Sequence, residues 1–183
     1  MTEEFLDLLR PHPVITVVGP QRSGTRIATA MIASDLGRTF VGEEEFMGVE
    51  EVAPGLIGSS LFRLFQLMDN SHDVVIHAPA LTSCAHFLPG MVVCMTRDAG
   101  AVAASAERIA WPWEKHQLGF YFTGEGDLVE VVRRAWAFQA AFLGERGVTL
   151  SYESLEGHPM WVDKPRRAGF HPHQISTDGA RHP

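Results

Sequence analysis

A short apolar run followed at once by a glycine-bearing loop constrains this chain more than any other feature. Residues 14–18, Val-Ile-Thr-Val-Val, are β-branched and almost wholly apolar, which is typical of a buried parallel strand. Gly19 opens the next segment, Gly24 closes it, and a helical pattern then runs through about Leu36, with Gly37 as its expected stop. A strand, a glycine loop and a helix in this order predict the opening unit of a nucleotide-binding α/β domain.

The rest of the chain alternates strand and helix patterns. Apolar runs at 73–77, 91–95 and 148–151 predict three more core strands. Strands that alternate with helices indicate an α/β protein with a three-layer, phosphate-loop nucleotide-binding fold and a mainly parallel sheet. Further helices are predicted over residues 61–68, from Asp98 to about Arg108 and from Asp127 to Phe142, and residues 42–58 are predicted to form a loop with at most short helices.

Length and charge limit the classes of protein to which this chain can belong. A chain of 183 residues predicts one domain, residues 1–183, with its core at about 14–170 and a flexible polar tail at 171–183. With 15 Lys and Arg against 22 Asp and Glu, the formal net charge is −7. An acidic chain does not favour nucleic acid as a partner, although a local basic pocket for a small anion is compatible with it.

The N-terminal residues and the cysteines indicate the expected cellular location of the protein. No apolar run approaches the roughly 20 residues that span a bilayer, and the N-terminal residues lack the pattern of a signal peptide. Cys84 and Cys94 are too few for a disulfide framework or a zinc site of their own. The expectation is a cytoplasmic protein in a reducing setting, with no membrane partner and no metal.

The loop between Gly19 and Gly24 has the spacing of the P-loop, G-x4-G-K-[ST], whose backbone amides bind phosphate. Thr25 stands where a nucleoside triphosphatase needs lysine, and Arg26 stands where it needs a magnesium-binding Ser or Thr. Arg22 places a cation inside the loop instead. Kinase or ATPase chemistry is disfavoured because it depends on that lysine and on Mg²⁺. The alternative is a tight strand–helix turn that binds nothing.

Three motifs in order resemble the sulfotransferase family. The loop P-Q-R-S-G-T, ending at Thr25, is similar to the family's P-x-[KR]-S-G-T-[TS]. Arg97 at a strand end is followed eight residues later by Ser105, as in the family's second motif. The segment S-Y-E-S-L, which contains Tyr152, is similar to the third. Together they span roughly residues 14–170.

The resemblance implies an enzyme that transfers a sulfuryl group from 3′-phosphoadenosine 5′-phosphosulfate to a hydroxyl or amine, without a metal. It implies that Arg97 and Ser105 hold the 3′-phosphate and that Arg22 stabilises the bridging oxygen. A donor with two separate anionic ends needs cations at both, so we expect two charge clusters at opposite ends of one cleft. The predicted donor-binding residues are Gln21, Arg22, Ser23, Gly24, Thr25, Arg26, Arg97, Ser105 and Tyr152.

His77 is the predicted general base. It ends the predicted strand at 73–77, and ligands of open α/β sheets gather at the carboxyl ends of the strands. The segment V-I-H-A-P around it resembles the family's K-T-H-x-P, in which the histidine is the base, and a pKa near 6.5 suits that task. A structural histidine at a strand end is the alternative. In that case Asp73 or the run Glu43 to Glu45 supplies the base.

The acceptor is expected to be a small molecule or glycan-like. An aromatic segment at residues 111–122 either caps an acceptor pocket or fills a core under a loop. Two other functions stay open. One is a nucleotide or small-molecule kinase with a degenerate P-loop, for which Asp98 is the nearest carboxylate after a core strand. The other is a non-catalytic nucleotide-binding or interaction protein.

Overall fold

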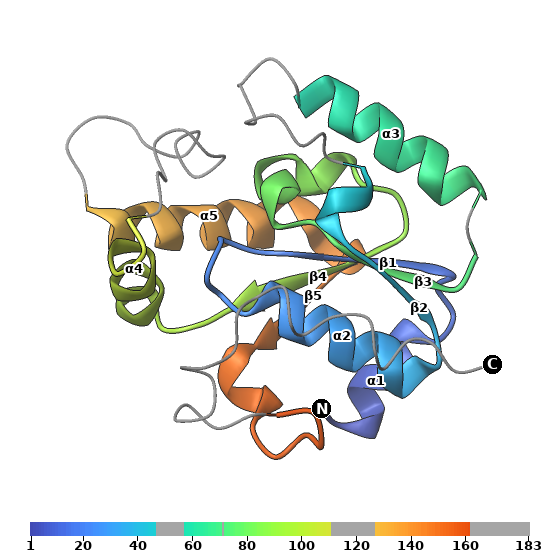
Figure 1. The fold of residues 1–183 in the computed structure, drawn as a ribbon, viewed down its shortest axis with the longest axis horizontal. Helices are drawn as coiled ribbons and strands as arrows, with labels where there is room; N and C mark the ends of the chain where they lie inside the picture. Colours follow the sequence, from blue (N-terminus) through green and yellow to red (C-terminus); the bar gives the residue numbers. More distant parts are fainter. Residues whose placement is uncertain (47–56, 71, 111–126, 162–183) are drawn as a thin grey trace.

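A five-stranded parallel sheet forms the centre of the protein (Figure 1). The computed structural model describes residues 1–46, 57–70, 72–110 and 127–161. The strands lie in the order β2-β3-β1-β4-β5, and every pairing is parallel. Their bounds are Val14–Val18 for β1, Thr39–Val41 for β2, Val74–His77 for β3, Met91–Thr96 for β4 and Gly147–Ser151 for β5.

Helices cover both faces of the sheet, so the expected three-layer α/β fold is confirmed. On one face, α1 (Glu3–Leu9) and α2 (Thr25–Leu36) pack through Leu9, Met31 and Ile32 against the sheet. On the other face, Leu64, Leu81 and Leu143 contribute to a second apolar cluster. The elements of that face are α3 (Ile57–Asn70), the 3₁₀ segment η2 (Pro79–Phe87) and α5 (Leu128–Leu143), and α4 (Ala99–Glu107) packs on α5.

The register gathers the predicted site at one edge of the sheet. Val17 of β1 is paired with His77 of β3, and Val18 is paired with Cys94 of β4. The segments that follow these three strands therefore emerge side by side. Parallel strands buried on both faces produce this arrangement, and it gives the glycine loop, His77 and Arg97 a common location.

Strand β2 was not predicted from the sequence. It has only three residues, and Thr39 is exposed, so the sequence contains no apolar run that would predict it. It pairs with β3 at the edge of the sheet, and the 3₁₀ segment η1 (Glu43–Glu45) follows it. The remaining short elements are η5 (Gly144–Arg146) and η6 (Tyr152–Leu155).

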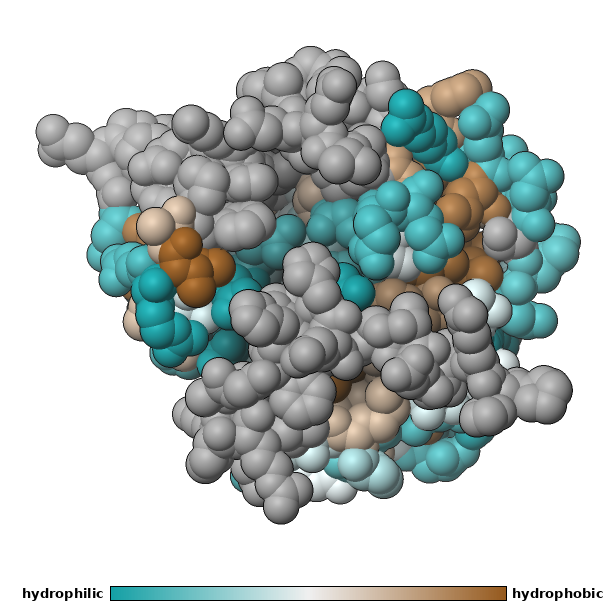
Figure 2. All heavy atoms as spheres, in the orientation of Figure 1, coloured by the Kyte–Doolittle hydropathy of each residue, from teal (hydrophilic) through white to brown (hydrophobic). Residues whose placement is uncertain are grey.

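Hydrophilic residues cover most of the described surface on the face drawn in Figure 2, with apolar residues exposed in smaller areas. Within the described ranges, no helix is long and apolar enough to cross a membrane. In the part of the chain that the structure describes, the exposed large apolar residues are Leu8, Phe62, Phe87, Ile109, Phe142 and Met160.

Candidate functional site

The loop that joins β1 to α2 has a backbone of unusual conformation. Arg22 has φ 74°, a left-handed backbone value that residues other than glycine adopt at a cost of about 1 kcal/mol or more. Gly24, with φ 96°, caps α2, and a Cβ there would stand 2.4 Å from the ring of Tyr152. Close packing against Tyr152 and the left-handed backbone therefore both require glycine at position 24.

The first peptide of the loop is fixed by η2. The amide of Gly19 donates to Thr82 Oγ1 at 3.0 Å, and the same oxygen lies 2.8 Å from the Gly19 carbonyl. The hydroxyl of Ser23 is fully buried and has no hydrogen-bond partner among the described residues. The first amides of α2 have no intrahelical acceptors, so the loop ends at the positive end of a twelve-residue helix.

Two arginines contact Ser105 beside the loop, and a third, Arg97, contacts the loop itself. Arg22 Nε donates to Ser105 Oγ at 3.1 Å, and Arg108 Nη2 approaches the same oxygen at 3.4 Å. Arg97 Nη1 donates to the carbonyl of Arg22 at 3.0 Å, and its guanidinium lies 4.1 Å from the ring centroid of Tyr152. Burial lowers the pKa of Arg22, and the charges of Arg108 and Arg97 lower it further.

The expectation of two cation clusters at opposite ends of a cleft is therefore wrong for this structure. Arg22 is in direct contact with Ser105 of the supposed second cluster. The reason is topological: β4 is the neighbour of β1, so α4, which follows β4, begins beside the loop that follows β1. A single cationic cluster results.

His77 is buried against the start of α2. Its Nε2 lies 3.0 Å from Thr25 Oγ1, and its Nδ1 is buried with no partner in the described structure. Burial lowers the pKa of His77 to about 3, and the charge of Arg26 acts in the same direction. The expectation of a pKa near 6.5 is wrong, because His77 is buried, with only 6% of the residue exposed.

Glu43 is the carboxylate that the structure turns toward the loop. Its Oε1 accepts a hydrogen bond from the amide of Ala80 at 2.8 Å, and the side chain of Gln21 also donates to it. Burial raises the pKa of Glu43 to about 7, and the neighbouring charge of Glu44 raises it as well. Arg26 works against this shift.

The other carboxylates named from the sequence lie elsewhere or have other contacts. Glu44 is paired with Arg26 at 3.4 Å, and Arg26 also lies 5.7 Å from the ring centroid of Phe40. Asp73 precedes β3, so it is at the opposite end of that strand from His77, where it lies 3.9 Å from Arg38. The sequence signal for Glu43 is its position just after an edge strand, but that strand was not predicted.

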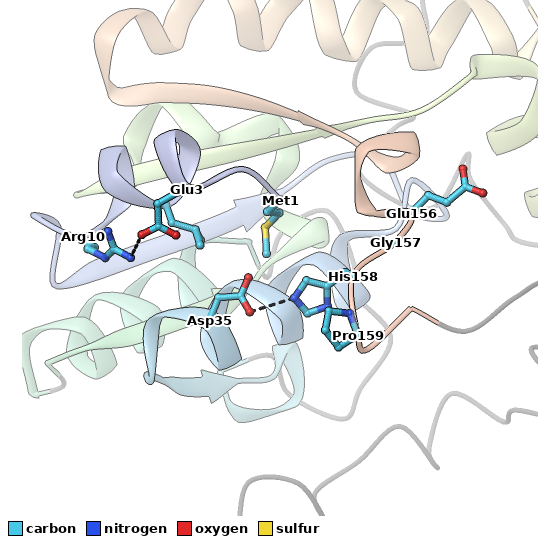
Figure 3. Close-up of a pocket in the computed structure, with 9 residues that line it drawn as sticks. Met1, Glu3, Arg10, Asp35, Glu156, Gly157, His158 and Pro159 are labelled. Atoms are coloured by element: carbon cyan, nitrogen blue, oxygen red, sulfur yellow. Dashed lines mark hydrogen bonds and ion pairs between the residues drawn. The ribbon is translucent and has the colours of Figure 1, made fainter.

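A surface pocket of about 550 Å³ lies away from the loop, between α1 and residues 156–159 (Figure 3). In it His158 Nε2 lies 3.0 Å from Asp35 Oδ1, and Arg10 is paired with Glu3. The predicted site residues do not line this pocket. The aromatic segment at 111–122 and the predicted tail at 171–183 lie outside the described residues.

Comparisons with known proteins agree with this architecture. No family model and no curated protein matches the sequence. Two similar solved structures are shikimate kinases. The one from Acinetobacter baumannii, in complex with shikimate, has a TM-score of 0.51 and 14% identity, covering 80% of this chain and 86% of that one. The one from Bacteroides thetaiotaomicron has a TM-score of 0.52 and 12% identity, covering 80% and 90%. The fold of this chain is therefore similar to that of these two proteins. Identity this low shows the fold alone.

Within this P-loop fold, the loop lacks the residues of a nucleoside triphosphatase. Thr25 and Arg26 replace the lysine and the magnesium-binding hydroxyl of the P-loop motif. Among the described residues no group of three His, Cys, Asp or Glu could hold a metal ion. The site brings together backbone amides, three guanidinium groups and one carboxyl whose pKa is near 7. Such a set can bind an anion and accept a proton.

Proposed function

We propose that this P-loop protein transfers a sulfuryl group from 3′-phosphoadenosine 5′-phosphosulfate to a hydroxyl or amine of a small-molecule or glycan-like acceptor. The observation that carries the proposal is the convergence of Arg22 and Arg108 on Ser105, directly beside the loop. A P-loop binds the phosphate chain at the 5′ end of a nucleotide, and the arginine cluster provides a second anion site next to it. A nucleotide with phosphates on two ribose positions fits such a pair of sites better than a linear triphosphate does.

Each part of the loop has a role in the proposed reaction. The loop amides and Thr25 bind the 5′-phosphate, with Gln21, Ser23, Gly24 and Arg26 completing the loop. Arg22 stabilises the charge that develops on the oxygen between phosphorus and sulfur. Tyr152 supports both Gly24 and Arg97 through ring contacts.

Glu43 is the general base of the proposed reaction. A carboxyl with a pKa of about 7 is ionised in part at neutral pH and is basic enough to take a proton. His77, with a pKa of about 3, is neutral but a weak base, and its Nε2 is engaged by Thr25. The acceptor oxygen or nitrogen forms a bond to sulfur while its proton passes to Glu43. The bond from sulfur to the bridging oxygen breaks, and adenosine 3′,5′-bisphosphate leaves.

Thermal unfolding in the presence of nucleotides tests the proposal. Adenosine 3′,5′-bisphosphate without added metal should raise the melting temperature, because a ligand that binds only the folded state stabilises it by RT ln(1 + [L]/Kd). A donor labelled with ³⁵S should then release label only when an acceptor is present. Absence of stabilisation by the bisphosphate at millimolar concentration would contradict the proposal.

Phosphoryl transfer from ATP is the second candidate. The similar solved structures are kinases, and one of them holds shikimate, a small molecule. A kinase requires Mg²⁺ to neutralise charge on the transferred phosphoryl group. Stabilisation by ATP only when Mg²⁺ is present, with none by the bisphosphate, would select this function. A protein that responds to neither ligand would be a non-catalytic member of the fold.

A further inference from the structure

Arg108 belongs to the cationic cluster, although no motif in the sequence marks it. It caps the C-terminal end of α4 through its backbone, and its exposed side chain turns back toward Ser105. We infer that Arg108, rather than Arg97, is the residue that selects donors by their second phosphate. This inference rests on the proposed function, because it assigns a specificity-determining residue to the proposed donor site.

The hydrogen bonds of Ser105 define what the cluster can accept. A serine hydroxyl has two lone pairs and one O–H donor. Arg22 Nε–H and Arg108 Nη2–H both point at this oxygen, so they fill the two lone pairs. Only the O–H donor is left for a ligand. Together with the remaining guanidinium N–H groups, the cluster offers donors alone, and the matching ligand is a group of acceptors alone, such as a phosphate dianion.

Charge in the cluster favours the same ligand. Among the described residues, none of the three arginines forms an ion pair within 4.0 Å. Asp98 and Glu153 act on Arg97 from farther away, and Asp98 is engaged as the N-cap of α4 by the amide of Ala101. Burial lowers the pKa of Arg22, and repulsion from Arg108 and Arg97 lowers it further. A bound dianion would relieve that repulsion.

Arg97 is committed to the loop itself. Its Nη1 holds the carbonyl of Arg22, the residue with the left-handed backbone, and its face lies on the ring of Tyr152. Loss of Arg97 therefore disturbs the loop, whichever nucleotide occupies it. Loss of Arg108 removes one donor from the Ser105 cluster and leaves the loop backbone in place. The two substitutions should differ in selectivity.

Titration calorimetry with two nucleotides separates these roles. We expect Arg108→Ala to weaken the binding of adenosine 3′,5′-bisphosphate by about 10- to 100-fold, which is the range of one hydrogen bond between charged groups. The affinity for adenosine 5′-monophosphate, which lacks the 3′-phosphate, should change by less than about threefold. Arg97→Ala should weaken both nucleotides by similar factors. Arg133→Ala is the charge-matched control, because it removes an exposed arginine of α5, and both affinities should stay within threefold.

Arg108→Gln provides a second variant that keeps a long polar side chain at the helix end, and a thermal melt of each variant verifies folding. Wild-type protein that binds neither nucleotide overturns both the proposed function and this inference. Wild-type protein that binds the bisphosphate, with Arg108 variants that weaken both nucleotides equally or neither, overturns the inference alone. If Arg97→Ala, but not the Arg108 variants, weakened the bisphosphate selectively, recognition of the second phosphate would be assigned to Arg97 and the inference would be overturned.

Discussion

Arg97 Nη1 lies 3.0 Å from the carbonyl oxygen of Arg22, so the residue that follows β4 supports the loop that follows β1. Arg22 has a φ of 74°, which is energetically costly for any residue except glycine. The sequence motif assigned Arg97 to phosphate binding alone. In the structure the same guanidinium also holds the backbone of the loop between β1 and α2.

Replacing Arg22 should separate stability from binding. Arg22→Gly and Arg22→Ala both remove the guanidinium, and each should weaken the bisphosphate by about 10-fold or more. Only glycine relieves the left-handed strain, so Arg22→Gly should be more stable than Arg22→Ala by about 1 kcal/mol. Urea unfolding of the two variants measures the difference. Equal stabilities would mean that the backbone at position 22 carries no strain.

Position 24 should tolerate no side chain. A Cβ at Gly24 would meet the ring of Tyr152 at 2.4 Å on a backbone with φ 96°. We expect Gly24→Ala to lower the free energy of unfolding by more than about 2 kcal/mol. Gly37→Ala is the matched control, because Gly37 has φ 64° and a Cβ added there would meet no atom within 4 Å, so only about 1 kcal/mol of strain is expected. Thermal or urea unfolding compares the two variants.

Activity should depend on the ionisation of Glu43. Because its pKa is raised to about 7, kcat/KM should rise with pH through about 7 as the carboxylate forms. Glu43→Gln should lower kcat by about 10²- to 10⁴-fold and remove that pH dependence. Glu44→Gln is the control: it breaks the exposed pair with Arg26 and removes a charge that raises the pKa of Glu43, so it should retain the pH dependence with a midpoint at lower pH. A Glu43→Gln enzyme with wild-type kcat would exclude Glu43 as the base.

Glu43 should also make the fold less stable at higher pH. Its folded-state pKa of about 7 exceeds the ordinary value of 4.5, so the folded protein binds more protons between these two values. The free energy of unfolding should therefore fall by about 2–3 kcal/mol as pH rises from 4.5 through 7. Glu43→Gln should lack this fall. Urea unfolding across that pH range measures it, and a parallel slope in both proteins would show that Glu43 is not its source.

His77 should have the opposite effect. Its folded-state pKa of about 3 lies below the ordinary 6.5, so the unfolded chain binds the additional proton between these values. Stability should fall by about 2 kcal/mol as pH decreases from 6.5 to 5. Because Glu43 opposes this change above pH 4.5, the measurement is best made in Glu43→Gln. Adding His77→Asn should flatten the slope, and an unchanged slope would assign it to another group.

Local sequence was sufficient for the elements whose signal is contained in neighbouring residues. The apolar run at Val14–Val18, the spacing of Gly19 and Gly24, and the helix stop at Gly37 each depend on backbone or side-chain preferences within a few positions. Those preferences predicted a parallel α/β fold, and the structure has that fold. Phosphate binding by the glycine loop stays a prediction.

Tertiary structure alone decided which groups meet at the site. Strand β2 is too short to have a pattern, yet its pairing with β3 places Glu43 against the amide of Ala80. The contact of Arg22 with Ser105 spans 83 positions and depends on β4 lying next to β1. Burial sets the pKa of Glu43 near 7 and that of His77 near 3. Solvation and charge at a site are properties of the packed neighbours, and strand order chooses those neighbours from distant parts of the chain.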